Sequence, residues 1–276
     1  MNVVSNTQQL EQRINHFFTL SDEHQKARGM LNALANSCPT WIFGGMVRDV
    51  ALFGPGGFSS DIDIVVNLPL NDLVSLLSKL STNTLRINKF GGIRFNYHNF
   101  EFDIWSLNET WAFRENHIAC TGESSLLKTT LMSWDAVLFD LRSEKVLSTE
   151  NYITDLYCRH LELVLKTNPN PCGSVTKILR TIFTKQVKTL GPEICQFLQD
   201  ELPKSCYEAL HVYDIRHHKS SSFTQNQFDD LVDLLSKKID PTKRFSLVIP
   251  QCESTPGKRS SPGNHQNPKL SSKSST

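Results

Sequence analysis

The sequence has no run of 18 uncharged apolar residues, so we expect no membrane-spanning helix and no membrane partner. Its first residues, MNVVSNTQQLEQR, lack the basic segment and apolar core that are typical of a secretory signal. The seven cysteines are an odd number and form no CxxC pair, which argues against a disulfide framework or a zinc site. Together these absences predict a cytoplasmic protein with free thiols.

An excess of charge of one sign is also missing. The 29 basic and 28 acidic residues leave a net charge of +1, so overall charge does not indicate a nucleic-acid partner. Hydrophobic residues make up 39% of the chain, enough for a globular protein with a proper core. Residues 251–276 are different, because they contain four basic residues, one acidic residue and almost nothing apolar. We expect a disordered basic tail there, either simply solvated or a weak tether for RNA.

Hydrophobic periodicity divides the rest of the chain into three parts. Residues 1–40 predict packing helices, since Leu10, Ile14 and Phe17 recur at spacings of three and four. Residues 41–150 contain short β-branched and aromatic runs around one helical stripe, which predicts a small mixed sheet with helices. His98 and Asn99 form the expected two-residue turn of a hairpin. Residues 151–250 are dominated by helical periodicity, so the predicted class is α+β, a head domain followed by a helical neck and body.

One amphipathic helix is expected within the body. The segment 175–190, VTKILRTIFTKQVKTL, places its apolar residues on one face and Lys177, Arg180 and Lys188 elsewhere. Gly191 and Pro192 predict the end of this helix.

Two glycines separate a predicted strand, WIF, from a predicted short helix, MVRDVALF. Gly44 and Gly45 permit a tight turn and leave backbone N–H groups uncovered beside the positive end of the helix dipole. Such a turn suits a triphosphate, although a glycine pair also serves as a turn with no ligand.

Acidic residues recur on one face of two predicted strands. Asp61 and Asp63 in DIDIVV are expected on the same side of a strand, with their α-carbons about 6.6 Å apart. Their carboxylates repel one another there unless a cation lies between them. Oxygen ligands of this kind suit Mg²⁺ or Mn²⁺, whereas the alternative is a polar strand face with two unconnected acids. In FEFDIW, Asp103 is our candidate for a third acid that completes a two-metal site and accepts a proton from a hydroxyl. Glu101 has the same facing and remains an alternative.

The segment from Gly44 to Asp63 resembles the opening motif of the nucleotidyltransferase superfamily of DNA polymerase beta. More narrowly, it is similar to the head and neck domains of class II CCA-adding tRNA nucleotidyltransferases and bacterial poly(A) polymerases. The shared pattern is GG-x-VRD, a Gly-Pro turn and DxD. The segments Thr129–Leu147 and Pro171–Phe183 extend the resemblance. Of these, Pro171–Phe183 is similar to the neck helix of the family, with Arg180 at a basic position.

The resemblance implies a metal-dependent enzyme that transfers a nucleoside monophosphate from an NTP to an acceptor hydroxyl and releases pyrophosphate. It implies that Asp61, Asp63 and Asp103 are catalytic and bind Mg²⁺ or Mn²⁺. The nucleotide-binding residues that it implies are Gly44, Gly45, Arg48, Asp49 and Arg180. Here Arg48 would reach the triphosphate, while Asp49 would brace the neck or bind ribose. Neighbouring residues on a helix do not face one another, so the alternative is a solvated surface pair.

Two departures from the family pattern bear on the substrate. The doubly basic Arg-Arg-Asp run is replaced by Ser-Leu-Leu-Lys-Thr-Thr, with Lys128 as its only cation, and the base-reading EDxxR pattern has no counterpart before Leu190. We expect RNA, in particular a tRNA 3′ end, as the acceptor. The alternatives are nucleotidylation of a protein or small molecule, and a degenerate protein that binds nucleotide without turnover.

Overall fold

A seven-stranded mixed sheet organises the first half of the chain. The computed structural model describes residues 3–80, 85–88, 91–237 and 243–247, so the predicted tail lies outside the described residues. The strand order is β3-β4-β5-β2-β1-β6-β7, with β2 and β5 parallel and all other neighbours antiparallel. The strands are β1 (Thr40–Phe43), β2 (Ile62–Val66), β3 (Arg86–Ile87), β4 (Ile93–Tyr97), β5 (Phe100–Ser106), β6 (Val137–Asp140) and β7 (Lys145–Ser148). The predicted α+β class with a mixed sheet is confirmed.

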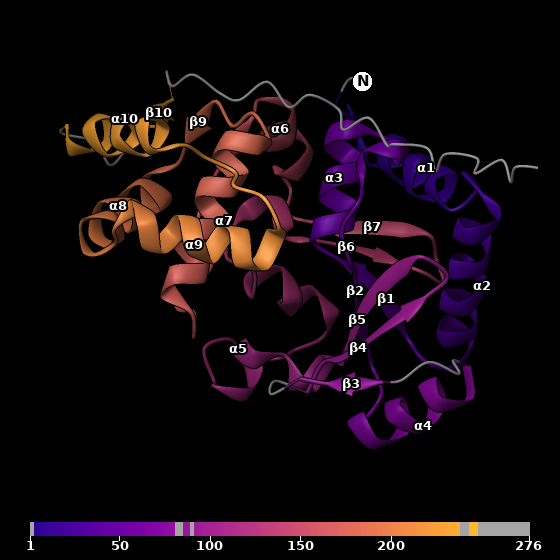
Figure 1. Cartoon of the computed structure of the whole chain (residues 1–276). Helices are drawn as coiled ribbons and strands as arrows, with labels where there is room; N and C mark the ends of the chain where they lie inside the picture. The colour runs from indigo at the N-terminus through magenta and orange to yellow at the C-terminus, as the bar shows by residue number, and fades with distance from the viewer. Residues whose placement is uncertain (1–2, 81–84, 89–90, 238–242, 248–276) are drawn as a thin grey trace, which may run out of the picture.

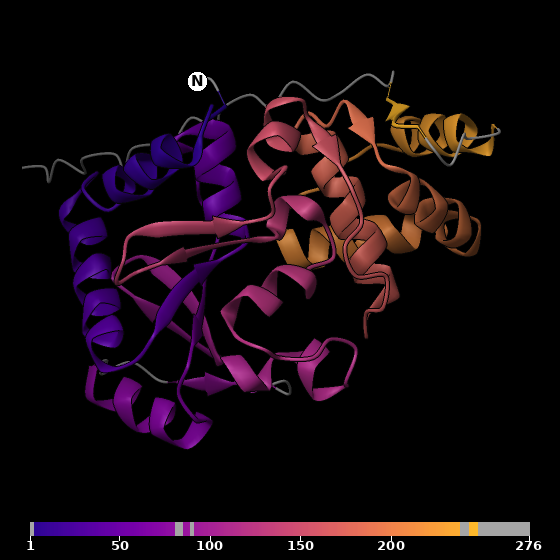
Figure 2. The same ribbon diagram turned by 180° about the vertical axis from the view of Figure 1, so that it is seen from behind.

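Helices from the first 80 residues cover one face of this sheet (Figures 1 and 2). They are α1 (Thr7–Phe17), α2 (Asp22–Ser37), α3 (Gly45–Phe53) and α4 (Leu70–Leu80). Their apolar stripes join Ile62, Ile64 and Ile104 of the sheet in the main core. Because side chains alternate along a strand, the residues between these isoleucines face the other side of the sheet. There a smaller apolar cluster contains Trp41 and Val65 and extends to α5 (Trp111–Arg114).

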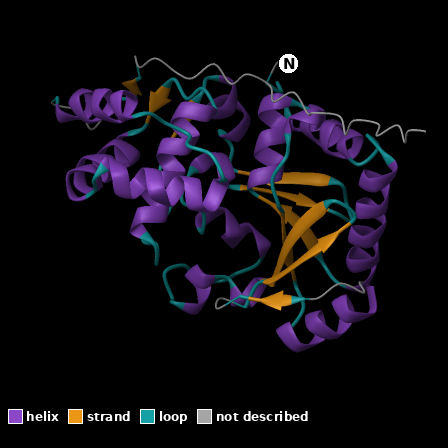
Figure 3. Cartoon of the chain, in the orientation of Figure 1, coloured by secondary structure: helices purple, strands orange, loops and turns teal. Residues whose placement is uncertain are grey.

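The second half of the chain is mainly helical, as Figure 3 shows. It contains α6 (Tyr152–Tyr157), α7 (Pro171–Thr184), α8 (Pro192–Glu201), α9 (Tyr207–His218) and α10 (Gln225–Ser236). A three-stranded sheet that the sequence did not predict joins β8 (His160–Leu161), β9 (Thr189–Leu190) and β10 (Phe245–Ser246). Among the described residues, no helix combines the length and the apolar character needed to cross a bilayer.

The prediction of one helix running to Leu190 is wrong at its C-terminal end. Helix α7 ends at Thr184, and Gln186 turns the chain with a φ of 57°. The following β-branched residues favour an extended chain, and Thr189 pairs in the small sheet. Pro192 is the first residue of α8, where its missing N–H costs no hydrogen bond, so it begins a helix and does not end one.

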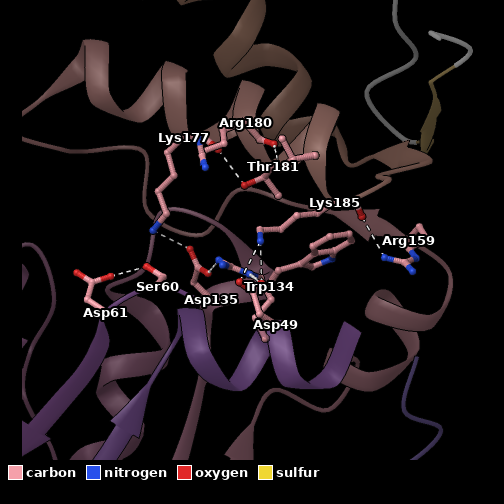
Figure 4. A network of polar contacts seen from close by, with 12 residues as sticks. Asp49, Ser60, Asp61, Trp134, Asp135, Arg159, Lys177, Arg180, Thr181 and Lys185 are labelled. Carbon is pink, nitrogen blue, oxygen red and sulfur yellow. Dashed lines mark hydrogen bonds and ion pairs between the residues drawn. The ribbon is translucent and has the colours of Figure 1, made fainter. Parts of the chain in front are cut away.

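Buried charges join the head to the body. On α3, Arg48 and Asp49 are only 8% and 7% exposed, and Arg48 Nε donates to Asp49 Oδ1 at 2.7 Å. Arg48 Nη1 also donates to Asp135 Oδ1. From the body, Lys185 Nζ donates to both oxygens of Asp49, at 2.8 and 3.0 Å, and Lys177 Nζ lies 2.8 Å from Asp135 Oδ2 (Figure 4). We call these five residues the α3–α7 charge network.

This network overturns the prediction that Arg48 and Asp49 do not face one another, and also the alternative of a solvated pair. The spacing rule describes where side chains leave the helix, whereas the long arginine side chain folds back to its neighbour. Burial alone would raise the pKa of Asp135, but Lys177 and Arg48 hold that pKa well below its usual range. Burial and the nearby Arg48 lower the pKa of Lys185 to about 8, although Asp49 opposes them.

We predict that Asp49→Ala lowers the free energy of unfolding by about 3 kcal/mol, because it leaves Arg48 and Lys185 buried without their shared partner. Urea titration of both proteins measures the difference. Asp72→Ala, in the exposed first turn of α4, is the matched control and is expected to cost less than about 0.5 kcal/mol. Equal losses in the two variants would contradict a stabilising role for the network.

We also predict that Lys185 loses its proton near pH 8, well below the ordinary value of about 10.4 for a lysine side chain. Asp49→Asn lowers the pKa of Lys185 further, because the neutral amide no longer stabilises the ammonium group. Side-chain NMR of Lys185 as a function of pH measures this pKa in the unmodified protein and in Asp49→Asn. A rise in the Lys185 pKa in Asp49→Asn would show that the sign of this interaction is wrong.

Candidate functional site

A cavity of about 720 Å³ lies between the sheet and the body. Its head side is formed by the start of α3 and by residues of β2 and β5 that point away from the main core. Its other wall comes from α7, α9 and the segment that leads into α7. All of the predicted site residues except Asp103 and Glu101 line this cavity, and those two belong to the adjoining strand face.

The predicted glycine turn forms one edge of the cavity. Gly44 has a φ of 64°, which an L side chain rarely adopts, and a Cβ there would lie 3.4 Å from the backbone oxygen of Asp135. A Cβ at Gly45 would make only an ordinary contact, so the turn requires Gly44 more than Gly45. Helix α3 has no side-chain cap, which leaves its first N–H groups open to a ligand.

Parallel pairing of β2 with β5 brings the predicted acids together. Asp63 lies directly opposite Asp103 in the register, and Asp61 comes just before β2 on the same side. Glu101 shares this side, but its side chain is 48% exposed, compared with 14% for Asp103. The register therefore places Asp103 beside Asp63, and Asp103 is the less exposed of the two candidates.

Negative charge on this face is only partly compensated. Burial, reinforced by Asp61 and Asp103, raises the pKa of Asp63 to about 8. One oxygen of Asp103, Oδ1, is buried and has no hydrogen-bond partner in the described part of the chain. Carboxylates in this state fit a hard divalent cation, whose charge would relieve the repulsion. Within the described residues, however, no three Asp, Glu, His or Cys side chains are arranged to enclose a metal ion as they stand.

An arginine that the sequence analysis missed contacts the same acids. Arg94 on β4 extends Nη2 to Asp103 Oδ2 at 2.8 Å and to Asp61 Oδ2 at 3.4 Å. Its Nη1 lies 3.5 Å from Glu101 Oε1. A sequence signal for this contact exists, because a two-residue turn at 98–99 places Arg94 directly across the hairpin from Asp103.

The body side of the cavity is basic and aromatic. Lys177 approaches Asp135, while Arg180 Nη1 donates to Asp214 Oδ1 at 3.3 Å and to Ser222 Oγ at 2.5 Å. On α9, the rings of Tyr213 and His217 stack with their centroids 4.0 Å apart. Helix α7 contains no acidic residue, and among the described residues no acid from the body lines the cavity. Apart from Lys177 and Arg180, these residues were not predicted as part of a site, since only the fold brings α9 to the cavity.

Comparison with known proteins finds relatives by structure only. No family model and no curated protein sequence matches the chain. The solved structure of the Thermotoga maritima CCA-adding enzyme complexed with tRNA is 13% identical, with a TM-score of 0.56 over 86% of this chain and 61% of that chain. A tRNA nucleotidyltransferase complexed with a primer tRNA and an incoming ATP analog is 15% identical. Its TM-score is 0.54, over 75% of this chain and 59% of that one.

A structure described as a tRNA-processing enzyme is 16% identical, with a TM-score of 0.54 over 74% of this chain and 55% of that chain. The chain thus spans less than two thirds of the length of these proteins. At such low identity the likeness concerns the fold. The chain shares a nucleotidyltransferase-like fold with these structures.

Proposed function

We propose that this protein is a metal-dependent nucleotidyltransferase that moves a nucleoside monophosphate from an NTP to an acceptor hydroxyl. The observation that carries the proposal is the meeting of Asp61, Asp63 and Asp103 on adjacent strands beside the Gly44 turn. Burial first, and then repulsion by Asp61 and Asp103, raises the pKa of Asp63, so the arrangement carries a cost. A site that binds cations gives this arrangement a function.

The chain's own groups suit the steps of such a reaction. The uncapped N–H groups at the start of α3 would hold the triphosphate, with Lys177 as a cation on the opposite wall. Asp103 would accept the proton of the acceptor hydroxyl, while the oxygen of that hydroxyl forms a bond to the α-phosphorus. The bond from that phosphorus to the bridging oxygen breaks, and pyrophosphate leaves.

Asp61, Asp63 and Asp103 would hold Mg²⁺ or Mn²⁺. The unpartnered oxygen of Asp103 and the raised pKa of Asp63 support this donor set. When bound, the metal would neutralise the triphosphate and stabilise charge on the attacking and leaving oxygens. Arg48 is buried and paired with both Asp49 and Asp135, so we assign it to the shape of the cavity. Lys177 pairs with Asp135 alone and its side chain is 52% exposed, so we leave the phosphate contact to Lys177.

RNA is the acceptor that we propose, in particular a tRNA 3′ end. Structural neighbours of this chain were solved with tRNA and with nucleotides. The wall opposite the acids offers Lys177 and Arg180 to phosphates, and the Tyr213–His217 pair presents aromatic surface on which a base can stack. The alternative is nucleotidylation of a protein or small molecule, which uses the same acids.

A second candidate is a protein that binds nucleotide without turnover. The ion pairs of Arg94 favour it, because they hold Asp61 and Asp103 in contacts that a metal would have to replace. Release of pyrophosphate that depends on Asp63 separates the two candidates.

We predict that Asp63→Asn lowers pyrophosphate release by at least about a hundredfold, since the amide cannot balance a divalent cation. The assay contains each labelled NTP in turn, Mg²⁺ and total cellular RNA. Asp230→Asn, on the exposed surface of α10, is the matched control and keeps full activity. Undiminished release in Asp63→Asn would refute the assignment of the site.

With RNA as the acceptor, we predict that the label from the NTP appears in a band that RNase removes. Transfer falls steeply as salt rises from 50 to 200 mM (about a tenfold or larger loss), because phosphate contacts release counterions. Gel separation with and without RNase, at several salt concentrations, measures both effects. A label that survives RNase and migrates with protein would favour the alternative acceptor.

A further inference from the structure

The cation that compensates the acid face belongs to the protein itself. Arg94 lies between Asp103 and Asp61, and reaches Glu101 with its other terminal nitrogen. All three partners are carboxylates on the face where a metal would bind. Its guanidinium therefore neutralises part of the negative charge that a divalent cation would otherwise neutralise.

The compensation is incomplete in a specific way. Arg94 forms ion pairs with Asp61 and Asp103, whereas no ion pair to Asp63 occurs in the described part of the chain. A divalent cation would gain from Asp63 an attraction that Arg94 does not satisfy, but would compete with Arg94 for the other two acids.

Nothing in its packing fixes Arg94 in this position. Its side chain is 47% exposed, and β4 lies next to the short edge strand β3. A long, half-exposed arginine can swing into water when a metal ion replaces it, because the metal then compensates the charge of Asp103. The ion pairs of Arg94 with Asp61 and Asp103 thus compete with a metal ion for these acids, and a bound metal ion can displace them.

We propose that Arg94 is a built-in counter-ion that weakens the binding of free divalent metal at Asp61, Asp63 and Asp103. The inference rests on the proposed function, because it concerns the same acids. It makes Arg94 a positioning residue, which holds Asp61 and Asp103 apart from a free metal ion. Metal delivered together with a triphosphate would displace it more readily, since the phosphates offer Arg94 another partner.

Titration with Mn²⁺ alone, followed by electron paramagnetic resonance of the free ion, tests this without turnover. Arg94→Gln is expected to lower the Kd for Mn²⁺ about tenfold, because it removes one positive charge a few ångströms from the ion. Arg94→Lys keeps the charge, so its Kd is expected to stay within about threefold of the unmodified protein.

Arg86→Gln is the matched control. Arg86 lies directly opposite Arg94 in the pairing of β3 with β4, and is exposed without an ion pair to any acid among the described residues. It is expected to leave the Kd unchanged, so that a change of net charge alone is excluded. A Kd for Arg94→Gln equal to that of the unmodified protein, or a decrease just as large in Arg86→Gln, would overturn the inference.

The two proposals fail in different ways. If pyrophosphate release depends on Asp63 but Arg94→Gln does not alter Mn²⁺ binding, the counter-ion role is wrong and the proposed function stands. If Arg94→Gln tightens Mn²⁺ binding but release is the same in Asp63→Asn, the counter-ion role stands and the proposed function is wrong.

Discussion

The α3–α7 charge network is the constraint on which the rest of the cavity depends. Arg48 and Asp49 sit on the helix that follows the glycine turn, and Lys177 and Lys185 come from the opposite wall. All of these charges except Lys177 are buried, and a buried charge is costly unless its partner is present, so head and body are held at one separation. The width of the cavity between the acids and α7 follows from that fixed separation.

The network carries three cations and two carboxylates, with Arg48, Lys177 and Lys185 outnumbering Asp49 and Asp135. On the head side of the cavity, the face of β2 and β5 that carries Asp61, Asp63 and Asp103 has an excess of acidic residues. One cavity thus has a positive wall and a negative wall. A nucleoside triphosphate with a divalent cation also combines both charges, and this match supports the proposed substrate more than the net charge of the whole chain does.

Local pattern was sufficient to predict the glycine turn, the strand that contains Asp63 and begins directly after Asp61, and the facing of Asp103. Each of these needs only the strand period or the conformational preference of glycine. Local pattern does not reveal which distant segments pair, so the contacts of Asp135 with Arg48 and Lys177 were not predicted. The end of α7 was misjudged because an apolar stripe continues into β9, where the same residues pack as a strand. The contact of Arg94 with Asp103 could have been predicted, because the two-residue hairpin turn places them opposite one another.

The hairpin of β4 and β5 has a consequence for how the sheet assembles. Its turn closes over two residues, so Arg94 and Asp103 meet through contacts that are local in sequence. The parallel pairing of β5 with β2 joins residues about forty positions apart and costs a larger loop-closure entropy. We therefore expect Asp103 to reach β2 with its counter-charge already in place. Arg94 would then lower the electrostatic barrier to docking two acidic strands, a contribution made during folding and before any ligand is present.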